Sequence, residues 1–247
     1  MIDHTTIVKL RAMRLSGMAA CLDNIAANPD LARLPAPRIV EMAVDWEWER
    51  RQDSKLSRLR RSAHLAQPGA DVADIQQLPG RRIDTDQIAR LAVGAYLAKH
   101  QDVIIQGPTG VGKTYIACAL ANKACQQYQT VAYLTAPELF DKLAVADRAG
   151  QRRQVLDSLT RTDLLVIDDW FLTAPNREQA RNLHVLVDRR HRHASTIYCT
   201  QLGPDQWHDR IEEKILADAI IDRITTNAHT ITLDTGDSLR RHYNQLD

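Results

Sequence analysis

The segment QGPTGVGKTYIAC, residues 106–118, decides the fold class of this 247-residue chain. It contains the pattern Gly-x-x-x-x-Gly-Lys-Thr from Gly107 to Thr114, directly after the apolar residues 103–105. Glycines let a loop turn several backbone N–H groups into one concavity, where they bind phosphate oxygens. The pattern carries meaning between a strand and a helix, so we expect a strand at residues 103–106 and a helix that starts near Gly112 or Lys113.

The residues of this loop have distinct expected parts in binding a nucleotide. Backbone N–H groups and the amino end of the helix attract phosphates. Lys113 supplies a mobile positive charge for the β- and γ-phosphates, and Thr114 supplies a hydroxyl for Mg²⁺. The alternative is a glycine-rich turn that matches by chance, and the flanking strand and helix patterns weigh against it. The predicted nucleotide-binding residues are Gly107, Pro108, Thr109, Gly110, Val111, Gly112, Lys113, Thr114 and Tyr115.

Two adjacent carboxylates, Asp168 and Asp169, follow the apolar residues 164–167. Buried, unpaired carboxylates are costly, whereas the carboxyl end of a parallel strand beside a phosphate loop is a common place for ligands. We therefore predict that Asp168 holds Mg²⁺ together with Thr114, and that Asp169 orients or deprotonates an attacking water. The alternative is that the two acids only cap the following turn.

The pattern along the chain predicts two parts of different class. After residue 84, apolar runs at 103–106, 131–135, 164–168 and 196–200 alternate with helical patterns, which indicates an α/β fold with helices on both faces of a parallel sheet. Earlier residues carry helical apolar stripes instead, such as Leu15, Met18, Leu22 and Ile25. We predict a small all-α N-terminal domain at 1–66, a linker at 67–83 with two Pro-Gly turns, and a nucleotide-binding domain at 84–247.

Composition limits the function classes further. The net charge is +1, so any basic surface is local. No apolar run has the length of a signal-peptide core or approaches the ~18 residues of a membrane helix, which predicts a cytoplasmic protein with no membrane partner. The cysteines form no Cys-x-x-Cys pair, and we interpret them as buried thiols: Cys21, Cys118, Cys125 and Cys199.

The motifs GPTGVGKT, LLVIDD, STIYCTQ and AIIDRI occur in this order, and together they resemble the AAA+ ATPases. Within that class the chain is most similar to IstB-type proteins, the ATP-binding helpers of insertion-sequence transposition, and to their relatives, the DnaC-type helicase loaders. The segments KLRAMRLSGMAACLDNI and DQWHDRIEEKILADAIIDRITTNAHTITLDTGDSLR resemble IstB-type sequences in particular. The resemblance covers nearly the whole chain and implies a P-loop NTPase domain of the AAA+ type after the helical domain.

The resemblance also implies residue roles that spacing alone does not give. Gln201 falls on the sensor position between the nucleotide and a partner subunit, and Arg223 resembles the arginine finger that completes a neighbour's site. From the residues alone, Arg223 has an alternative as the ion-pair partner of Asp218 or Asp222. Arg240 or Arg241 resembles a second sensor arginine. The predicted catalytic residues are thus Lys113, Asp168, Asp169, Gln201 and Arg223, with ATP and Mg²⁺ as cofactors.

Two of these positions depart from the pattern of the class. Many AAA+ proteins have Glu where this chain has Asp169, and Asn where it has Gln201. Asp is one methylene shorter and Gln is one longer. We expect the changes to affect hydrolysis more than ATP binding.

Basic residues mark two candidate DNA contacts. Arg51, Lys55 and Arg58 share one helical face, which suits salt-dependent contact with a phosphate backbone, although a solvated helix face is the alternative. A second basic cluster, at residues 189–193, precedes the apolar run at 196–200. Trp46, beside the first cluster, fits an apolar stripe and is expected in the core. The candidate DNA-binding residues are Arg50, Arg51, Lys55, Arg58, Arg61, Arg189 and Arg190.

The resemblance implies an oligomeric ATPase with active sites between subunits. Such a protein would bind duplex DNA in its ATP form and hand it to the transposase of the same element. Three alternatives stay open: a helicase loader whose N-terminal domain binds a helicase, a nucleotide-dependent scaffold that does not hydrolyse ATP, and a small-molecule phosphotransferase. The lack of a readable substrate lid weighs against the last.

Overall fold

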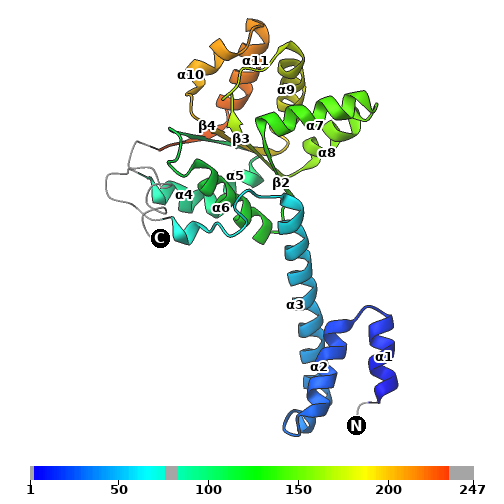
Figure 1. Cartoon of the computed structure of the whole chain (residues 1–247). Coiled ribbons are helices and arrows are strands. Elements are labelled where there is room, and N and C mark those ends of the chain that lie inside the picture. Colours follow the sequence, from blue (N-terminus) through cyan, green and yellow to red (C-terminus); the bar gives the residue numbers. More distant parts are fainter. Residues whose placement is uncertain (1–2, 76–82, 234–247) are drawn as a thin grey trace, which may run out of the picture. The chain divides into compact units, whose positions relative to one another are not determined.

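The computed structural model describes residues 3–75 and 83–233 (Figure 1). Contacts between residues divide the chain into two compact units, Met1–Arg58 and Leu59–Asp247. We call them the N-terminal unit and the C-terminal unit and describe each by itself. The domain boundaries predicted at residues 66 and 83 stay predictions.

The N-terminal unit is helical, as predicted. Its apolar stripe on α2 packs between two neighbours: Ile7 and Leu10 lie on one side, and Ala43 lies on the other. Trp46 does not join this core and is 39% exposed, so that expectation was wrong, because its backbone and not its ring meets α2 at Gly17. The elements are α1 (His4–Ala12), α2 (Ser16–Ala27), η1 (Leu31–Arg33) and α3 (Ala36–Ala63), whose last residues belong to the other unit.

The C-terminal unit contains the predicted parallel sheet. Within the described residues its strand order is β2-β3-β4-β1-β5, and all pairs are parallel. The runs expected at 103–106, 131–135, 164–168 and 196–200 all form strands. The last strand was not predicted, because it lies at the sheet edge and only Ile231 is buried. The strands are β1 (Asp102–Gln106), β2 (Val131–Thr135), β3 (Leu164–Trp170), β4 (Ser195–Thr200) and β5 (Ala228–Thr232).

Helices cover both faces of this sheet (Figure 1). One face packs against a core that contains Leu139, Leu183 and Ile220. On the other side α6 buries Ile116 and Leu120. The helices are α4 (Thr85–Ala92), α5 (Ala95–Ala98), α6 (Lys113–Gln126), α7 (Ala136–Arg148), α8 (Arg152–Arg161), α9 (Arg177–Arg190), α10 (Pro204–Trp207), η3 (His208–Arg210) and α11 (Lys214–Thr225).

Part of the stretch interpreted as a linker is held against α6. The side-chain amide of Asn122 donates hydrogen bonds to the carbonyl oxygens of Pro68 and Ala70, at 3.0 and 2.8 Å. A short helix, η2 (Val72–Asp74), follows, and Lys123 lies 3.4 Å from Asp71. The backbone of residues 68–71 therefore runs along α6, the helix that starts at the glycine motif.

Two expectations from composition concern the described residues. All four cysteines are buried, and burial raises the pKa of the Cys118 thiol to about 11. Among the helices of residues 3–75 and 83–233, none combines the length and apolar character needed to cross a bilayer.

Candidate nucleotide-binding site

The predicted phosphate loop, residues 107–114, joins β1 to α6, and its backbone takes the form that its glycines allow. Gly107, Gly110 and Gly112 have φ values of 157°, 83° and 97°. A Cβ atom on Gly107 would lie 2.6 Å from the backbone oxygen of Leu233, so this position has no room for a side chain. The helix starts at Lys113, as the motif predicted, which sets the positive end of its dipole at the loop.

Lys113 lies over this loop. Its Nζ donates hydrogen bonds of 2.8 Å to the carbonyl oxygens of Gly107 and Pro108. The ammonium group is thus held where phosphate oxygens could replace the carbonyl oxygens as acceptors. Thr109 is exposed near the loop tip. Tyr115, which the sequence also assigned to the nucleotide, follows Thr114 in α6, and its hydroxyl accepts a hydrogen bond from the backbone N–H of Asp71 at 3.3 Å.

Asp168, near the end of β3, lies beside the start of α6. Its Oδ2 accepts hydrogen bonds from Thr114 Oγ1 at 2.6 Å and from Tyr133 Oη at 2.8 Å. Its Oδ1 accepts a hydrogen bond from the backbone N–H of Asp169 at 2.8 Å. The residue is only 5% exposed, and these donors fix the carboxylate in one orientation. The structure thus brings together the hydroxyl and the carboxylate that the sequence assigned to Mg²⁺.

Tyr133 is a residue of this site that sequence reasoning missed. In the sheet it is paired with Val166, two residues before Asp168, so its side chain reaches Asp168 diagonally across two parallel strands. Burial raises the pKa of the Tyr133 hydroxyl, and the negative charge of Asp168 raises it further. The hydroxyl therefore remains protonated and serves as a donor. Only the strand order and register could have revealed this contact.

Asp169 stands on an irregularity of β3. The pairing of β3 with β4 shifts between Ile167 and Trp170, and Asp169 has a left-handed φ of 54°. Such bulges redirect side chains. Asp169 is exposed, while Asp168 and Trp170 on either side are buried. The second acid therefore projects from the carboxyl edge of the sheet, next to the fixed first acid.

Gln201 directly follows β4 at the same edge. The backbone N–H of Gly107 donates a 3.1 Å hydrogen bond to the carbonyl oxygen of Thr200. This bond attaches the end of β4 to the start of the phosphate loop. Gln201 is exposed and is the next residue in the chain, so the structure places it beside the loop.

Arg223, on α11, contacts a different acid from those that the sequence offered. Its Nε donates to Asp188 on α9 at 2.9 Å, and its Nη1 donates to the carbonyl oxygen of Ala219 at 2.9 Å. Asp218 lies instead 3.3 Å from His208. The guanidinium of Arg223 is thus bound between two helices, and its side chain is 31% exposed. Arg240 and Arg241 lie outside the described residues.

The assignment of Arg190 to DNA is wrong. Its side chain is buried, at 2% exposure, and donates to Thr196 Oγ1 at 3.0 Å and to the carbonyl oxygens of Leu159 and Thr162. These bonds tie α9 to β4 and to the end of α8. Arg189, the preceding residue, is partly exposed and pairs with Asp157 at 2.9 Å.

Sheet order and phosphate loop together identify the C-terminal unit as a P-loop nucleotide-binding domain of the AAA+ class. The crystal structure of the DnaC helicase loader has this fold: the match has a TM-score of 0.58 and covers 66% of this chain and 96% of that one, at 16% identity. At such identity the likeness concerns the fold alone.

The sequence places the chain more narrowly. Residues 8–246 match the model of the IstB-like ATP binding proteins, and the chain belongs to that family. An insertion sequence ATP-binding protein of Sinorhizobium fredii, y4pL, is 35% identical over 98% of both chains. The ATP-binding protein of insertion sequence IS1162 from Pseudomonas fluorescens is 35% identical over 82% of this chain and 87% of its own length. The predicted resemblance is confirmed.

Proposed function

We propose that this protein is an oligomeric ATPase that binds duplex DNA in its ATP form and assists the transposase of its insertion sequence in capturing target DNA. The observation that carries the enzymatic part is the 2.6 Å contact between Thr114 and Asp168 beside the phosphate loop. Hydroxyl and carboxylate oxygens are the hard ligands that Mg²⁺ prefers, and phosphates and waters usually supply the rest of its shell. The residues present therefore fit the ion.

The proposed reaction uses residues from three elements. Lys113 and the loop N–H groups would bind the phosphates, and Thr114 and Asp168 would hold Mg²⁺, which when bound neutralises charge on the phosphates. Asp169, exposed beside them, would accept a proton from the water that attacks the γ-phosphate. Gln201 would orient that water or the γ-phosphate. The products are ADP and inorganic phosphate.

Two observations support assembly and partners. The named relatives belong to insertion sequences, which supports a transposase of the same element as partner. Arg223 is bound to α9 and is still about one-third exposed, so it is available to complete the nucleotide site of a second copy. Duplex DNA would contact the basic side chains of α3 and Arg189.

A helicase loader is the second candidate, and the fold shared with DnaC favours it. In that case the N-terminal unit would bind a helicase and not DNA. A scaffold that binds ATP without turnover is the third, supported by Asp169 and Gln201, which differ from the commoner residues of the class.

Phosphate release from ATP, measured with and without duplex DNA, tests the proposal. We expect Mg²⁺-dependent release that duplex DNA stimulates, and none from Lys113→Ala or Asp169→Asn. Lys99→Ala, which removes a lysine at the end of α5, is the matched control. ATP binding without release would favour the scaffold. Release that single-stranded but not duplex DNA stimulates would favour the helicase loader.

A further inference from the structure

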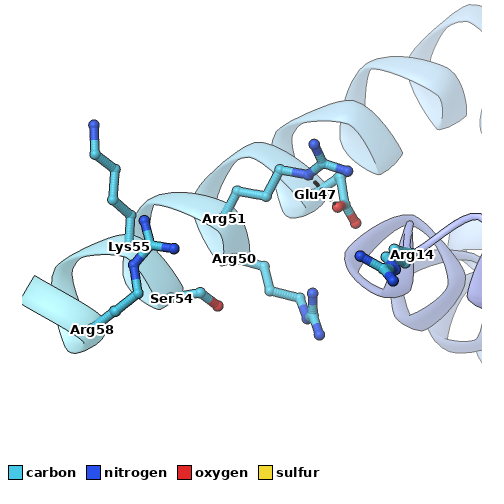
Figure 2. Close-up of a pocket in the computed structure, with 7 residues that line it drawn as sticks. All are labelled: Arg14, Glu47, Arg50, Arg51, Ser54, Lys55 and Arg58. Atoms are coloured by element: carbon cyan, nitrogen blue, oxygen red, sulfur yellow. Dashed lines mark hydrogen bonds and ion pairs between the residues drawn. The ribbon is translucent and has the colours of Figure 1, made fainter.

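A pocket of about 350 Å³ lies within the N-terminal unit, on the side of α3 next to the α1–α2 corner. Figure 2 shows Arg14 reaching toward this space from the corner and Arg50 from α3. Arg14 was not among the predicted sites, whereas four of the predicted basic residues line the pocket. We call it the basic pocket, and its lining residues are Arg14, Glu47, Arg50, Arg51, Ser54, Lys55 and Arg58.

The acidic residue of the pocket is already engaged. Glu47 is 6% exposed, and its Oε2 accepts hydrogen bonds from the backbone N–H groups of Gly17 at 2.7 Å and Met18 at 3.3 Å. Its Oε1 accepts from Arg51 Nε at 2.7 Å. Glu47 therefore caps α2, whose own N-cap residue makes no side-chain bond, and it orients Arg51. Its charge is balanced by these groups and leaves an excess of positive charge in the pocket.

The two walls of the pocket are held together tightly. A Cβ atom on Gly17 would lie 2.6 Å from the Cα of Glu47, so only glycine permits this approach of α2 to α3. Arg14, in the corner before α2, has a left-handed φ of 61°. The position of Arg14 opposite α3 thus follows from a tight turn and a close helix contact, and does not depend on a flexible segment.

Along α3, acidic and basic side chains lie mostly on different faces, although Glu47 pairs with Arg51 and Glu41 pairs with Arg38. Solvated helices commonly mix signs at i, i+4 spacing. Here acids recur every four residues along one exposed face, at Glu41, Asp45, Glu49 and Asp53. At about 100° per residue, Glu49 and Asp53 lie opposite the face formed by Arg51, Lys55 and Arg58. Like charges close together destabilise the free protein, and an anion in the pocket would relieve this repulsion.

We propose that the basic pocket binds a phosphate group of the duplex DNA backbone, with Arg14 and Arg50 as its principal ligands. This inference rests on the proposed function and assigns its DNA contact to particular residues. A guanidinium binds phosphate oxygens in a bidentate manner. Of the lining side chains that the structure describes, none is aromatic, so the pocket offers no platform for stacking unpaired bases. It therefore suits sequence-independent contact with a duplex.

Salt-dependent anisotropy of a labelled duplex with the full-length protein tests this assignment. The logarithm of the binding constant falls as the logarithm of the salt concentration rises, and each lost phosphate contact makes this negative slope less steep by about 0.9. We expect this decrease, with several-fold weaker binding, in Arg14→Asn and in Arg50→Gln. Asn tolerates the left-handed backbone of Arg14. Arg14→Lys keeps the charge and should retain the slope. Arg33→Asn, which removes an exposed arginine of the same unit outside the pocket, is the matched control.

The outcomes separate this inference from the proposed function. If Arg14→Asn and Arg33→Asn change the salt slope and the affinity for duplex DNA equally, the pocket assignment is wrong, while duplex binding by the protein stands. A second possible result is that the salt slope becomes less steep in the two pocket variants only, and by the same amount with ATP, with ADP and without nucleotide. That result would support the pocket assignment and contradict ATP-gated DNA binding. If the wild-type protein binds no duplex at low salt, both are wrong. Tighter binding of single strands than of duplex would also overturn the pocket assignment.

Discussion

The hydroxyl of Tyr133 and that of Thr114 donate hydrogen bonds to the same oxygen, Oδ2 of Asp168, at 2.8 and 2.6 Å. Thr114 is a proposed metal ligand, whereas Tyr133 acts only through Asp168 and is a positioning residue. Groups that orient a metal ligand are commonly worth about 10–100-fold in metal affinity.

We predict that Tyr133→Phe raises the Mg²⁺ concentration for half-maximal ATP turnover by about tenfold, the order of one lost hydrogen bond to a charged group. ATP binding in the presence of a chelator should not change, because the phosphate loop is intact. Mn²⁺ binding followed by electron paramagnetic resonance gives a readout that is independent of turnover. Tyr96→Phe is the control, since the buried Tyr96 hydroxyl has no hydrogen-bond partner among the described residues. Equal metal dependence in both variants would contradict the role of Tyr133.

The left-handed backbone of Asp169 gives a physical reason for its short side chain. Asp and Asn adopt this conformation more readily than other non-glycine residues. We predict that Asp169→Glu lowers the free energy of unfolding by about 1 kcal/mol, whereas Asp169→Asn keeps it and removes turnover. Urea denaturation of the two variants measures the difference. Equal stability of the Glu and Asn variants would show that the bulge does not restrict this position.

The pair of Arg223 and Asp188 offers a way to separate structure from catalysis. A finger arginine contributes about 10³–10⁵-fold to turnover. We predict that Arg223→Ala lowers turnover by at least 10³-fold and leaves ATP binding to the monomer intact, while Asp188→Ala retains most of the turnover. Both variants lose the same ion pair, so a purely structural role would give them the same phenotype in phosphate-release assays.

Asp102, the first residue of β1, makes stability depend on pH. It is 9% exposed, and its Oδ1 accepts a hydrogen bond from the backbone N–H of Thr196 at 2.7 Å. Burial raises its pKa to about 7 although that bond and the charge of Arg190 oppose the shift. Because the folded pKa lies above the unfolded value of about 3.9, the folded state binds the proton more tightly. This contribution to stability is full below pH 4 and is lost as the pH rises toward 7.

We therefore expect the stability of the wild-type protein, relative to Asp102→Asn, to fall between about pH 4 and pH 7. Urea denaturation of both proteins across this range measures the difference, and comparison with the Asn variant cancels the contributions of other carboxylates. Parallel stability profiles would contradict a raised pKa in the folded state.

The features that could be predicted from the sequence are those that depend on a local pattern of residues. The phosphate loop needs glycines and a lysine at fixed spacing, and the central strands need continuous apolar runs. Strand β5 lacks such a run because it lies at an edge. Tyr133 joins the site only through strand order, which no local pattern contains.

Burial explains the error at Arg190. Arg189 and Arg190 are adjacent in sequence, but successive helical residues point about 100° apart. One therefore reaches the surface while the other enters the protein. Within a cluster of charged residues, the packing of neighbouring helices and strands decides which side chain meets solvent.

The strand order has a consequence for how the protein is made. Val103 of β1 is paired with Ile197 and His229, both of which are synthesised long after it. At roughly 5–20 residues per second, the strand that leads into the phosphate loop emerges from the ribosome several seconds before either neighbour. A nascent chain thus carries an unpaired apolar strand and no finished nucleotide site, so ATP can stabilise this protein only after β4 and β5 have been synthesised.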